Sequence, residues 1–405
     1  MRVYLVGGAV RDRLLGIKAV DRDYVVVGAT PEEMVARGFS PVGADFPVFL
    51  HPDTHEQYAL ARTERKTGPG YRGFTVHAAP DVTLEDDLRR RDLTINAMAE
   101  AEDGTLIDPF GGAEDLRNGV LRHVSAAFAE DPVRILRVAR FAARYAKWGF
   151  HVAHSTNALM RRMVESGEAD ALVAERVWVE MERALAEVRP SVFFKVLRGC
   201  GALDRLFPEI AALFGVPQPE QHHPEVDAGL HVLKVLDEAA SLTGDTRVRF
   251  AALMHDVGKS RTPRQQWPDH TGHEQAGVDI IREFCLRLRV PKDYRDLAML
   301  VARYHGYCHR AAELPAVMML EMLEAIDAFR RPGRIDQFLL ACEADARGRC
   351  GFEDEPYPQA SRVRCAFEAA RTIGGADAIR AGIMGPAAGQ WIRQERLAAI
   401  DRALR

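Results

Sequence analysis

The hydrophobic pattern of the chain changes character near residue 130. Before it, short apolar runs such as VYLV at residues 3–6 and YVVV at residues 24–27 are separated by loops, which is typical of buried strands. After it, apolar residues recur at helical spacing, as in RILRVARFAARY at residues 134–145. No convincing strand is predicted after residue 150. The pattern predicts an α+β part, with a mixed sheet and helices, followed by an all-α part.

Breaks in this pattern predict the domain boundaries. A chain of 405 residues is too long for one ordinary core. The proline-rich segment FGVPQPEQHH at residues 214–223 predicts a linker, and RRPGR at residues 330–334 predicts a second break. These breaks predict four domains, namely a head over residues 1–128, a helical neck over residues 129–213, a helical domain over residues 224–330 and a helical tail over residues 331–405.

Composition and cysteine spacing exclude several classes of protein. The net charge is −4, so a nucleic-acid partner would need a local basic patch. None of the six cysteines lies in a Cys-x-x-Cys pair, which favours a reduced, cytoplasmic protein without a zinc ribbon. No apolar run of about 18 residues occurs, so the sequence predicts neither a membrane span nor a secreted protein.

Two glycines and two aspartates form the most informative local pattern. Gly7 and Gly8 end the first apolar run, where the backbone can approach a phosphate closely. Asp21 and Asp23 precede the second run and, being two residues apart, can point to the same side of a strand. Such a pair suits Mg²⁺ ions that hold a triphosphate for in-line nucleotidyl transfer. Taken alone, Asp-x-Asp is more often a solvated turn.

Two arginine-rich motifs extend this chemistry. Three adjacent arginines at residues 89–91 suit an anion such as a triphosphate or an RNA backbone. Asp131 and Arg134 are three residues apart on a predicted helix, so a carboxylate and a guanidinium share one face. That combination can read the Watson–Crick edge of a base, although Asp-x-x-Arg more often means a surface salt bridge. Arg137 and Arg140 continue near the same face.

Histidines gather in the third predicted domain. His255 and Asp256 end an apolar helix and are followed by glycine and lysine. Further histidines lie on neighbouring predicted helices, at residues 231, 270, 273 and 305. Imidazole and carboxylate together form a plausible site for a divalent transition metal.

The ordered motifs GGAVRD, DRD, RRDLTINAMA, DPFGG–DL and EDPVRILRVARF resemble those of the class II tRNA nucleotidyltransferases, the CCA-adding enzymes. These enzymes share a polymerase-β-like nucleotidyltransferase head with bacterial poly(A) polymerases. The match covers the first ~145 residues in order. The His-Asp domain and the connector ARTERKTGPGYRGF make the chain look closest to the bacterial multifunctional CCA proteins. The resemblance implies a head of that fold followed by neck, HD and tail domains that are all α.

The resemblance also implies roles for residues of the head. Asp21 and Asp23 would be catalytic and would hold two Mg²⁺ ions. Gly8 and Arg11 would contact the triphosphate, and Arg91 would bind phosphate or ribose. The incoming CTP or ATP would pair with Asp131 and Arg134, supported by Arg137 and Arg140. Glu56 is a candidate for a third acidic ligand, with Gln57 beside it.

The His-Asp motif resembles the HD superfamily of metal-dependent phosphohydrolases. His231, His255 and Asp256 would be metal ligands, with His305 or Asp345 as the fourth, for Ni²⁺, Co²⁺ or Mn²⁺. His305 is followed by Gly306 in this chain, whereas the similar subfamily has His-Asp there. The implied activities are those of a phosphatase, a 2′-nucleotidase and a 2′,3′-cyclic phosphodiesterase.

The favoured function is template-independent addition and repair of the tRNA 3′-terminal CCA from CTP and ATP. We expect tRNA and these two nucleotides as partners, no membrane contact, a cytoplasmic location, and a monomer or homodimer. A poly(A) polymerase or an enzyme that adds only part of CCA is the alternative within the same fold. An HD phosphohydrolase whose head only binds RNA is an alternative of a different class, and a nucleotide-sensing regulatory protein is a third.

Overall fold

The computed structural model describes residues 1–18, 21–42, 47–66, 74–219 and 226–405. It divides into two compact units, each considered by itself. The first comprises Met1–Glu180 and Val192–Leu206, and the second Met181–Ser191 and Phe207–Arg405. Residues 220–223 of the predicted linker and residues 67–73 of the predicted connector lie outside the described residues. The division into four domains remains a prediction.

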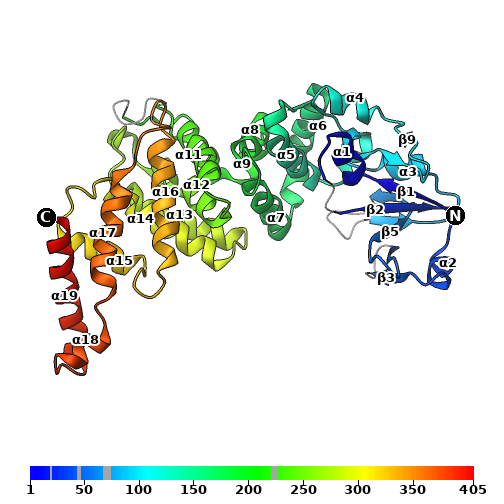
Figure 1. Cartoon of the computed structure of the whole chain (residues 1–405). Helices are drawn as coiled ribbons and strands as arrows, with labels where there is room; N and C mark the ends of the chain where they lie inside the picture. Colours follow the sequence, from blue (N-terminus) through cyan, green and yellow to red (C-terminus); the bar gives the residue numbers. More distant parts are fainter. Residues whose placement is uncertain (19–20, 43–46, 67–73, 220–225) are drawn as a thin grey trace. The chain divides into compact units, whose positions relative to one another are not determined.

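The first unit contains a mixed seven-stranded sheet in the order β3-β4-β5-β2-β1-β8-β9. Figure 1 shows β1, β2 and β5 side by side within it. Only the β2–β5 pair of neighbours is parallel, and the other pairs are antiparallel. The strands are β1 (Arg2–Val6), β2 (Asp23–Val27), β3 (Ser40–Val42), β4 (Val48–Leu50), β5 (Gln57–Leu60), β8 (Ala99–Glu100) and β9 (Leu106–Ile107). A separate hairpin pairs β6 (Thr63–Lys66) with β7 (Phe74–His77).

Strand β2 is buried on both faces, which explains its continuous apolar run. Val25 and Val27 pack in a core cluster with Val6 of β1. Val26 points the other way and packs with Met34 and Phe49. Because successive side chains of a strand face opposite sides, both sides of this sheet need apolar partners here. The polar residue at the start of the strand therefore marks the point where it leaves the core.

Short helices surround the sheet and longer ones follow it. The helices of the first unit are α1 (Gly8–Leu14), α2 (Pro31–Ala36), α3 (Leu84–Arg89), α4 (Gly112–Arg117), α5 (Val133–Tyr145), α6 (His154–Glu165), α8 (Ser191–Gly199) and α9 (Ala202–Leu206), and α7 (Ala174–Leu185) continues into the second unit. In α5 the apolar residues are buried, while Arg134 and Arg137 stay partly exposed. A stripe of this kind turns one face of the helix to the core and the other to solvent.

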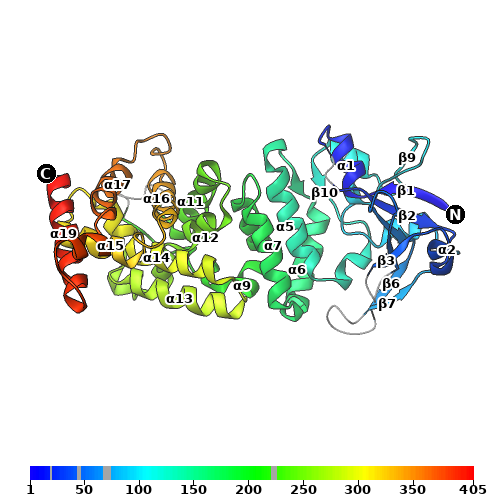
Figure 2. The ribbon, with the colours of Figure 1, turned by 60° about the horizontal axis from the view of Figure 1, so that its bottom comes forward.

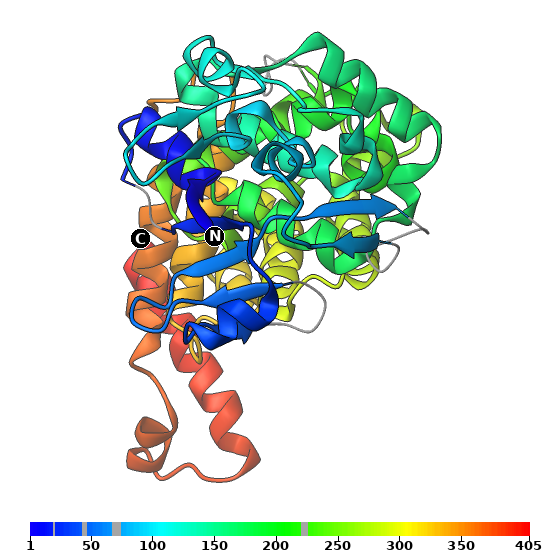
Figure 3. The same cartoon turned by 90° about the vertical axis from the view of Figure 1, so that its right-hand side faces the viewer.

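The named elements of the second unit are all helices over its described residues, and one isolated antiparallel bridge joins Pro217 and Asp227. Figure 2 shows α13 and α14 running side by side in its bundle. In Figure 3, α18 and the start of α19 extend beyond that bundle. Its helices are α10 (Pro208–Ala211), α11 (Ala228–Leu242), α12 (Thr246–Met254), α13 (His273–Arg287), α14 (Lys292–His309), α15 (Ala316–Ala325), α16 (Gly333–Arg347), α17 (Pro358–Arg371), α18 (Gly375–Arg380) and α19 (Pro386–Leu404).

The predicted fold class is confirmed, with one correction. The expectation of no strand after residue 150 is wrong, since β11 (His151–Val152) pairs in parallel with β10 (Val120–Leu121). Two residues are too few to produce an alternating pattern in the sequence. All six cysteines are free thiols. None of the described helices combines the length and hydrophobicity needed to cross a membrane.

Candidate functional sites

The two predicted catalytic aspartates lie at one end of the central strand pair. Asp23 is the first residue of β2 and is paired across the sheet with Val6, the last residue of β1. Asp21 precedes the strand and is exposed, and both carboxylates line a cleft of about 1080 Å³ in the first unit. Neither carboxylate forms an ion pair with a described side chain. Two unpaired carboxylates facing one cleft fit the oxygen-donor chemistry of Mg²⁺.

The turn after β1 depends on glycine. Gly7 has φ of +69°, a conformation that favours glycine. A Cβ atom there would lie only 2.8 Å from Nη1 of Arg91. The missing side chain thus lets Arg91 lie over the turn, while Nη2 of Arg91 donates to Asp87 at 3.1 Å. Burial raises the pKa of Asp23, Arg91 opposes that shift, and the charge of Asp21 adds to it.

The triphosphate candidates are held in place by side chains close to them. Nη1 of Arg11 donates to Oδ1 of Asn96 at 2.5 Å, and its Nε donates to Asp12 at 2.9 Å. The guanidinium also lies over the ring of Phe141, 5.2 Å from its centroid. Gly8, the first residue of α1, lines the same cleft. Arg11 is therefore buried and oriented before any anion binds.

The predicted base-reading residues reach the same cleft from the start of α5, since Asp131 lies just before the helix and Arg134 in its first turn. The Asp131 carboxylate accepts two hydrogen bonds from Arg176, at 3.2 and 2.9 Å. The Arg134 guanidinium donates to the backbone carbonyls of Ala127 at 3.0 Å and Arg90 at 2.7 Å. These contacts fix the acceptor and the donor separately, each from a different part of the unit.

The remaining predicted arginines also line the cleft and have acidic partners. Nε of Arg137 donates to Asp92 at 2.7 Å, and Nε of Arg140 donates to Glu180 at 2.7 Å. All nine residues predicted for the nucleotidyltransferase site, five in the predicted head and four in the predicted neck, thus lie around one cleft, although their roles are untested. Four further residues of the cleft had no signal in the sequence because their partners lie far away along the chain, namely Asp92, Asn96, Arg176 and Glu180.

Two residues considered from the sequence do not reach this cleft. Glu56 does not line it, and its carboxylate instead accepts a hydrogen bond from Thr54 at 3.1 Å. Arg89, the first of the three adjacent arginines, pairs with Glu85 at 2.6 Å on the surface of α3. Only Arg90 and Arg91 of that motif line the cleft, because the helix ends at this point and turns them inward.

The Asp92–Arg137 pair should contribute to stability in a pH-dependent way. Burial would raise the pKa of Asp92, but Arg137 and a hydrogen bond from Asn96 outweigh it and hold that pKa well below its usual range. A carboxyl with a depressed pKa stabilises the fold above its unfolded pKa of about 4, and this contribution is lost as the pH falls toward the folded value. Asp92→Asn should therefore destabilise the head by about 2 kcal/mol at pH 7. The loss is smaller than for a fully buried pair, because Arg137 keeps 35% of its side chain exposed to water.

Differential scanning calorimetry at pH 7 and at pH 3 checks this expectation. The difference in free energy of unfolding between the parent and Asp92→Asn should be smaller at pH 3 than at pH 7. Asp81→Asn, a substitution at an exposed carboxylate of the same unit, is the matched control. An equal difference in free energy of unfolding at both pH values would show that the Asp92–Arg137 pair does not stabilise the fold in a pH-dependent way.

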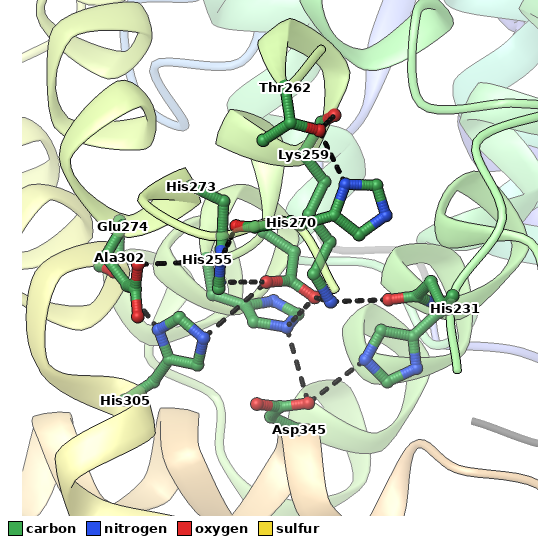
Figure 4. A network of polar contacts seen from close by, with 12 residues as sticks. His231, His255, Lys259, Thr262, His270, His273, Glu274, Ala302, His305 and Asp345 are labelled. Carbon is green, nitrogen blue, oxygen red and sulfur yellow. Dashed lines mark hydrogen bonds and ion pairs between the residues drawn. The ribbon is translucent and has the colours of Figure 1, made fainter. Parts of the chain in front are cut away.

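The second unit contains a cluster of histidines and aspartates (Figure 4). His231 lies on α11, His255 and Asp256 follow α12, and Asp345 lies on α16. His273 begins α13, and His305 lies on α14. Both candidates for the fourth ligand are therefore present, with Asp345 beside His231 and His255, and His305 beside Asp256. The sequence analysis noted His273 without predicting it as a ligand.

Backbone carbonyls fix the ring orientation of three of these histidines. The Nδ1 atoms lie 2.7 Å from the Ala252 oxygen in His255, 3.0 Å from the His270 oxygen in His273 and 3.0 Å from the Val301 oxygen in His305. An Nδ1–H that donates to a carbonyl leaves Nε2 as the free ligand atom, which is the usual arrangement around a metal. The buried Nε2 atoms of His255 and His273 have no hydrogen-bond partner among the described residues. The donor set thus fits a divalent transition metal.

Charges in this cluster are strongly coupled. Burial disfavours a charged His255, but the carboxylates of Asp345 and Asp256 outweigh it and raise the pKa of His255 to about 10. Burial also opposes the charged aspartates, yet Lys259 and His255 hold the pKa of Asp256 far below its usual range. In the absence of a cation, a proton on His255 therefore lies beside the two carboxylates, and it would be released when a metal binds there.

Part of the cluster lines a cavity of about 500 Å³, namely Asp256, His273, His305 and Asp345, whereas His231 and His255 do not reach it. Lys259, Arg310 and Arg349 bring positive charge to the cavity lining. Nε2 of His309 donates to Oδ2 of Asp345 at 2.7 Å, and Nδ1 of His309 lies 3.0 Å from the Tyr357 hydroxyl, which donates to Sγ of Cys308. His270 has a different task, because its ring bonds Thr262 and the Pro217 carbonyl, at 2.6 and 2.7 Å.

Three family models match the chain. Residues 3–122 match the poly A polymerase head domain, residues 149–214 match the probable RNA and SrmB-binding site of polymerase A, and residues 229–337 match the HD domain. The first match contains Asp21 and Asp23, and the third contains His255 and Asp256. The two aspartates and the His-Asp pair therefore fall in two different matched domains, whereas residues 131–140 and Asp345 lie outside the matched ranges.

Relatives of known name match over the whole chain. The multifunctional CCA protein of Nitrosococcus oceani is 62% identical over 404 residues, which cover 100% of this chain and 99% of the relative. The protein of the same name from Methylococcus capsulatus is 62% identical and covers 99% of this chain and 95% of its own length.

Solved structures share the fold. A CCA-adding enzyme in complex with CTP has a TM-score of 0.66 at 23% identity, and the match covers 99% of this chain and 87% of that one. The Thermotoga maritima CCA-adding enzyme complexed with tRNA has a TM-score of 0.63 at 21% identity, with 100% and 92% covered.

Proposed function

Since the chain belongs to the family of multifunctional CCA proteins, we propose that it adds and repairs the 3′-terminal CCA of tRNA, using CTP and ATP. The observation that carries the proposal is the cleft of the first unit, where unpaired Asp21 and Asp23 face a group of oriented arginines. Divalent metals, basic groups and a carboxylate pair are the requirements of nucleotidyl transfer. A cytoplasmic location and a monomeric or homodimeric state remain predictions.

Each part of the cleft has a role in the proposal. Arg11 and Arg91 bind the triphosphate, and the Gly7–Gly8 turn lets it approach the backbone. Asp21 and Asp23 hold the Mg²⁺ ions, which neutralise phosphate charge and lower the pKa of the attacking tRNA hydroxyl when bound. In-line attack on the α-phosphorus then extends the RNA by one nucleotide and releases pyrophosphate.

Asp131 and Arg134 select the nucleotide in this proposal. The carboxylate accepts from the exocyclic amino group that cytosine and adenine share, and the guanidinium donates to a ring acceptor of the base. Arg176 holds Asp131 in position, and the Arg90 carbonyl holds Arg134. A pocket that recognises these groups excludes uracil and guanine, which carry a carbonyl where cytosine and adenine carry the amino group.

Asp131→Asn should lower kcat/KM for CTP and for ATP by about 10- to 100-fold, because it removes a charge-assisted hydrogen bond worth about 1.5–3 kcal/mol. The amide can also donate, so relative use of UTP should rise. Single-turnover incorporation with each nucleotide measures both effects. Glu165→Gln, at an exposed position of α6, is the control. Unchanged selectivity would remove Asp131 from base reading.

A product-length assay tests the main proposal. The purified chain is incubated with Mg²⁺ and tRNA that lacks CCA, and the product is sized on a sequencing gel. CTP alone should add two nucleotides, and CTP with ATP should add three and stop. A long A-tail would identify a poly(A) polymerase. No extension with any nucleotide mixture would refute the proposal.

We also propose that the HD domain hydrolyses phosphate esters with a divalent transition metal, Ni²⁺, Co²⁺ or Mn²⁺. The supporting observation is the location of the cluster in a cavity that Lys259, Arg310 and Arg349 also line, since these cations suit a phosphoryl group. The expected substrates are phosphomonoesters, 2′-nucleotides and 2′,3′-cyclic phosphates. Release of phosphate from p-nitrophenyl phosphate and opening of 2′,3′-cyclic AMP, each with Ni²⁺, test this activity. No turnover with any of the three metals would count against it.

A further inference from the structure

Six histidines and aspartates of the cluster in the second unit form two groups of possible metal ligands. His231, His255 and Asp345 make up the first group, and Asp256, His273 and His305 make up the second. Within each group the possible ligand atoms all lie within 4.8 Å of one another. One ion bound by the first group would leave the second without a cation.

The second group has its own bare ligand atoms. Because Nδ1 of His273 and of His305 lies against a backbone carbonyl, their Nε2 atoms present lone pairs. Both Nε2 atoms face Oδ1 of Asp256, at 3.3 Å and 3.5 Å. Oδ1 is itself buried, and no described residue forms a hydrogen bond with it. Three acceptors that face one another repel unless a cation lies between them.

Asp256 connects the two groups through its two oxygens. Oδ1 faces His273 and His305, whereas Oδ2 lies 3.2 Å from Nε2 of His255. Lys259 also donates to Oδ2 at 2.5 Å and fixes the carboxylate plane. A carboxylate in this position can bind one ion through each oxygen.

We propose that this cluster is a dinuclear metal centre, in which Asp256 bridges one ion held by His231, His255 and Asp345 and a second ion held by His273 and His305. Four imidazoles and two carboxylates favour first-row divalent transition metals over Mg²⁺ or Ca²⁺. The inference deepens the proposed phosphohydrolase function, because two adjacent ions can bind both the attacking and the leaving oxygen of a phosphate ester. It assigns His273, which the sequence analysis had not selected, to the second ion.

Metal counting tests the inference without relying on activity. An Asp21→Ala/Asp23→Ala parent removes the Mg²⁺ candidates of the head, and the full-length chain is loaded with Ni²⁺, desalted and measured by inductively coupled plasma mass spectrometry. The parent should retain two ions per chain. His273→Gln and His305→Gln, each made in the parent, should retain one. Circular dichroism confirms that each variant is folded.

A matched control and a second readout make the outcome decisive. His151→Gln in the parent background alters an exposed histidine outside the cluster and should retain two ions. With Mn²⁺, electron paramagnetic resonance should show a spin-coupled pair in the parent and an isolated ion in His305→Gln. A parent with one ion, or a His273→Gln variant that still holds two, would overturn the dinuclear centre.

The same samples separate this inference from the proposed activity. Phosphatase turnover with a single ion per chain would leave the phosphohydrolase proposal standing and reject the second ion. Two ions per chain without turnover of any phosphate ester would support the dinuclear centre and reject the proposed phosphohydrolase activity.

Discussion

Asp23→Asn is expected to lower CCA addition by at least about 1,000-fold, an increase of roughly 4 kcal/mol in the barrier. The change keeps the shape of the side chain at the start of β2 but removes a charge that faces the cleft. Burial already raises the pKa of Asp23, so the neutral amide should be tolerated by the fold. Single-turnover incorporation of CTP at saturating Mg²⁺ measures the loss.

The second unit provides the internal control for this variant. Phosphate-ester hydrolysis with Ni²⁺ should be unchanged in Asp23→Asn, because its site lies on α11 to α16. Asp81→Asn, at an exposed carboxylate of the first unit, should keep full transferase activity. Transferase activity of Asp23→Asn within tenfold of the parent would refute the assignment of Asp23 as a metal ligand.

Asp345→Asn should have the opposite effect. It should lower phosphate-ester hydrolysis by at least about 100-fold and leave CCA addition unchanged. Oδ1 of Asp345 lies 3.0 Å from Nε2 of His231 and 3.3 Å from Nε2 of His255, and Oδ2 accepts from His309. An amide nitrogen in place of either oxygen removes a ligand or faces a histidine donor. Hydrolysis of 2′,3′-cyclic AMP at a range of Ni²⁺ concentrations measures the effect.

The same titration separates a ligand from a residue that only supports the fold. Loss of a metal ligand should also raise the Ni²⁺ concentration that gives half-maximal hydrolysis, whereas loss of a purely structural residue should not. Asp279→Asn, at a half-exposed carboxylate of α13, should behave like the parent. Full hydrolysis by Asp345→Asn at ordinary Ni²⁺ would leave His305 as the better candidate for the fourth ligand.

Motifs of neighbouring residues made much of both sites predictable. Gly7, Gly8 and the two aspartates lie at the ends of β1 and β2, and the antiparallel pairing of these strands brings the ends together. Residues a few positions apart on one strand or helix have nearly fixed relative positions, so their spacing in the sequence predicts which of them lie together. The helical spacing of α5 likewise predicted that Arg134 and Arg137 share a face.

Partners from distant parts of the chain could not be predicted. Arg176 lies on α7, 45 positions from Asp131 along the chain, and only the tertiary fold brings the two side chains together. Asn96 reaches Arg11 across 85 positions of sequence. His273 gave no local signal either, because a histidine at the start of a helix is ordinary. The short β11 was missed for the same reason, since its pairing with β10 is purely tertiary.

The cleft of the first unit is less positive than its arginines suggest. Nine arginines line it, but so do seven carboxylates, which leaves a surplus of only two positive charges among the described residues. A nucleoside triphosphate brings more negative charge than that. The cleft should therefore bind free triphosphate weakly and its Mg²⁺ complex well, so that the metal determines affinity as well as chemistry. An enzyme with such a balance would lose its hold on pyrophosphate once Mg²⁺ departs, which favours release of the product over reversal.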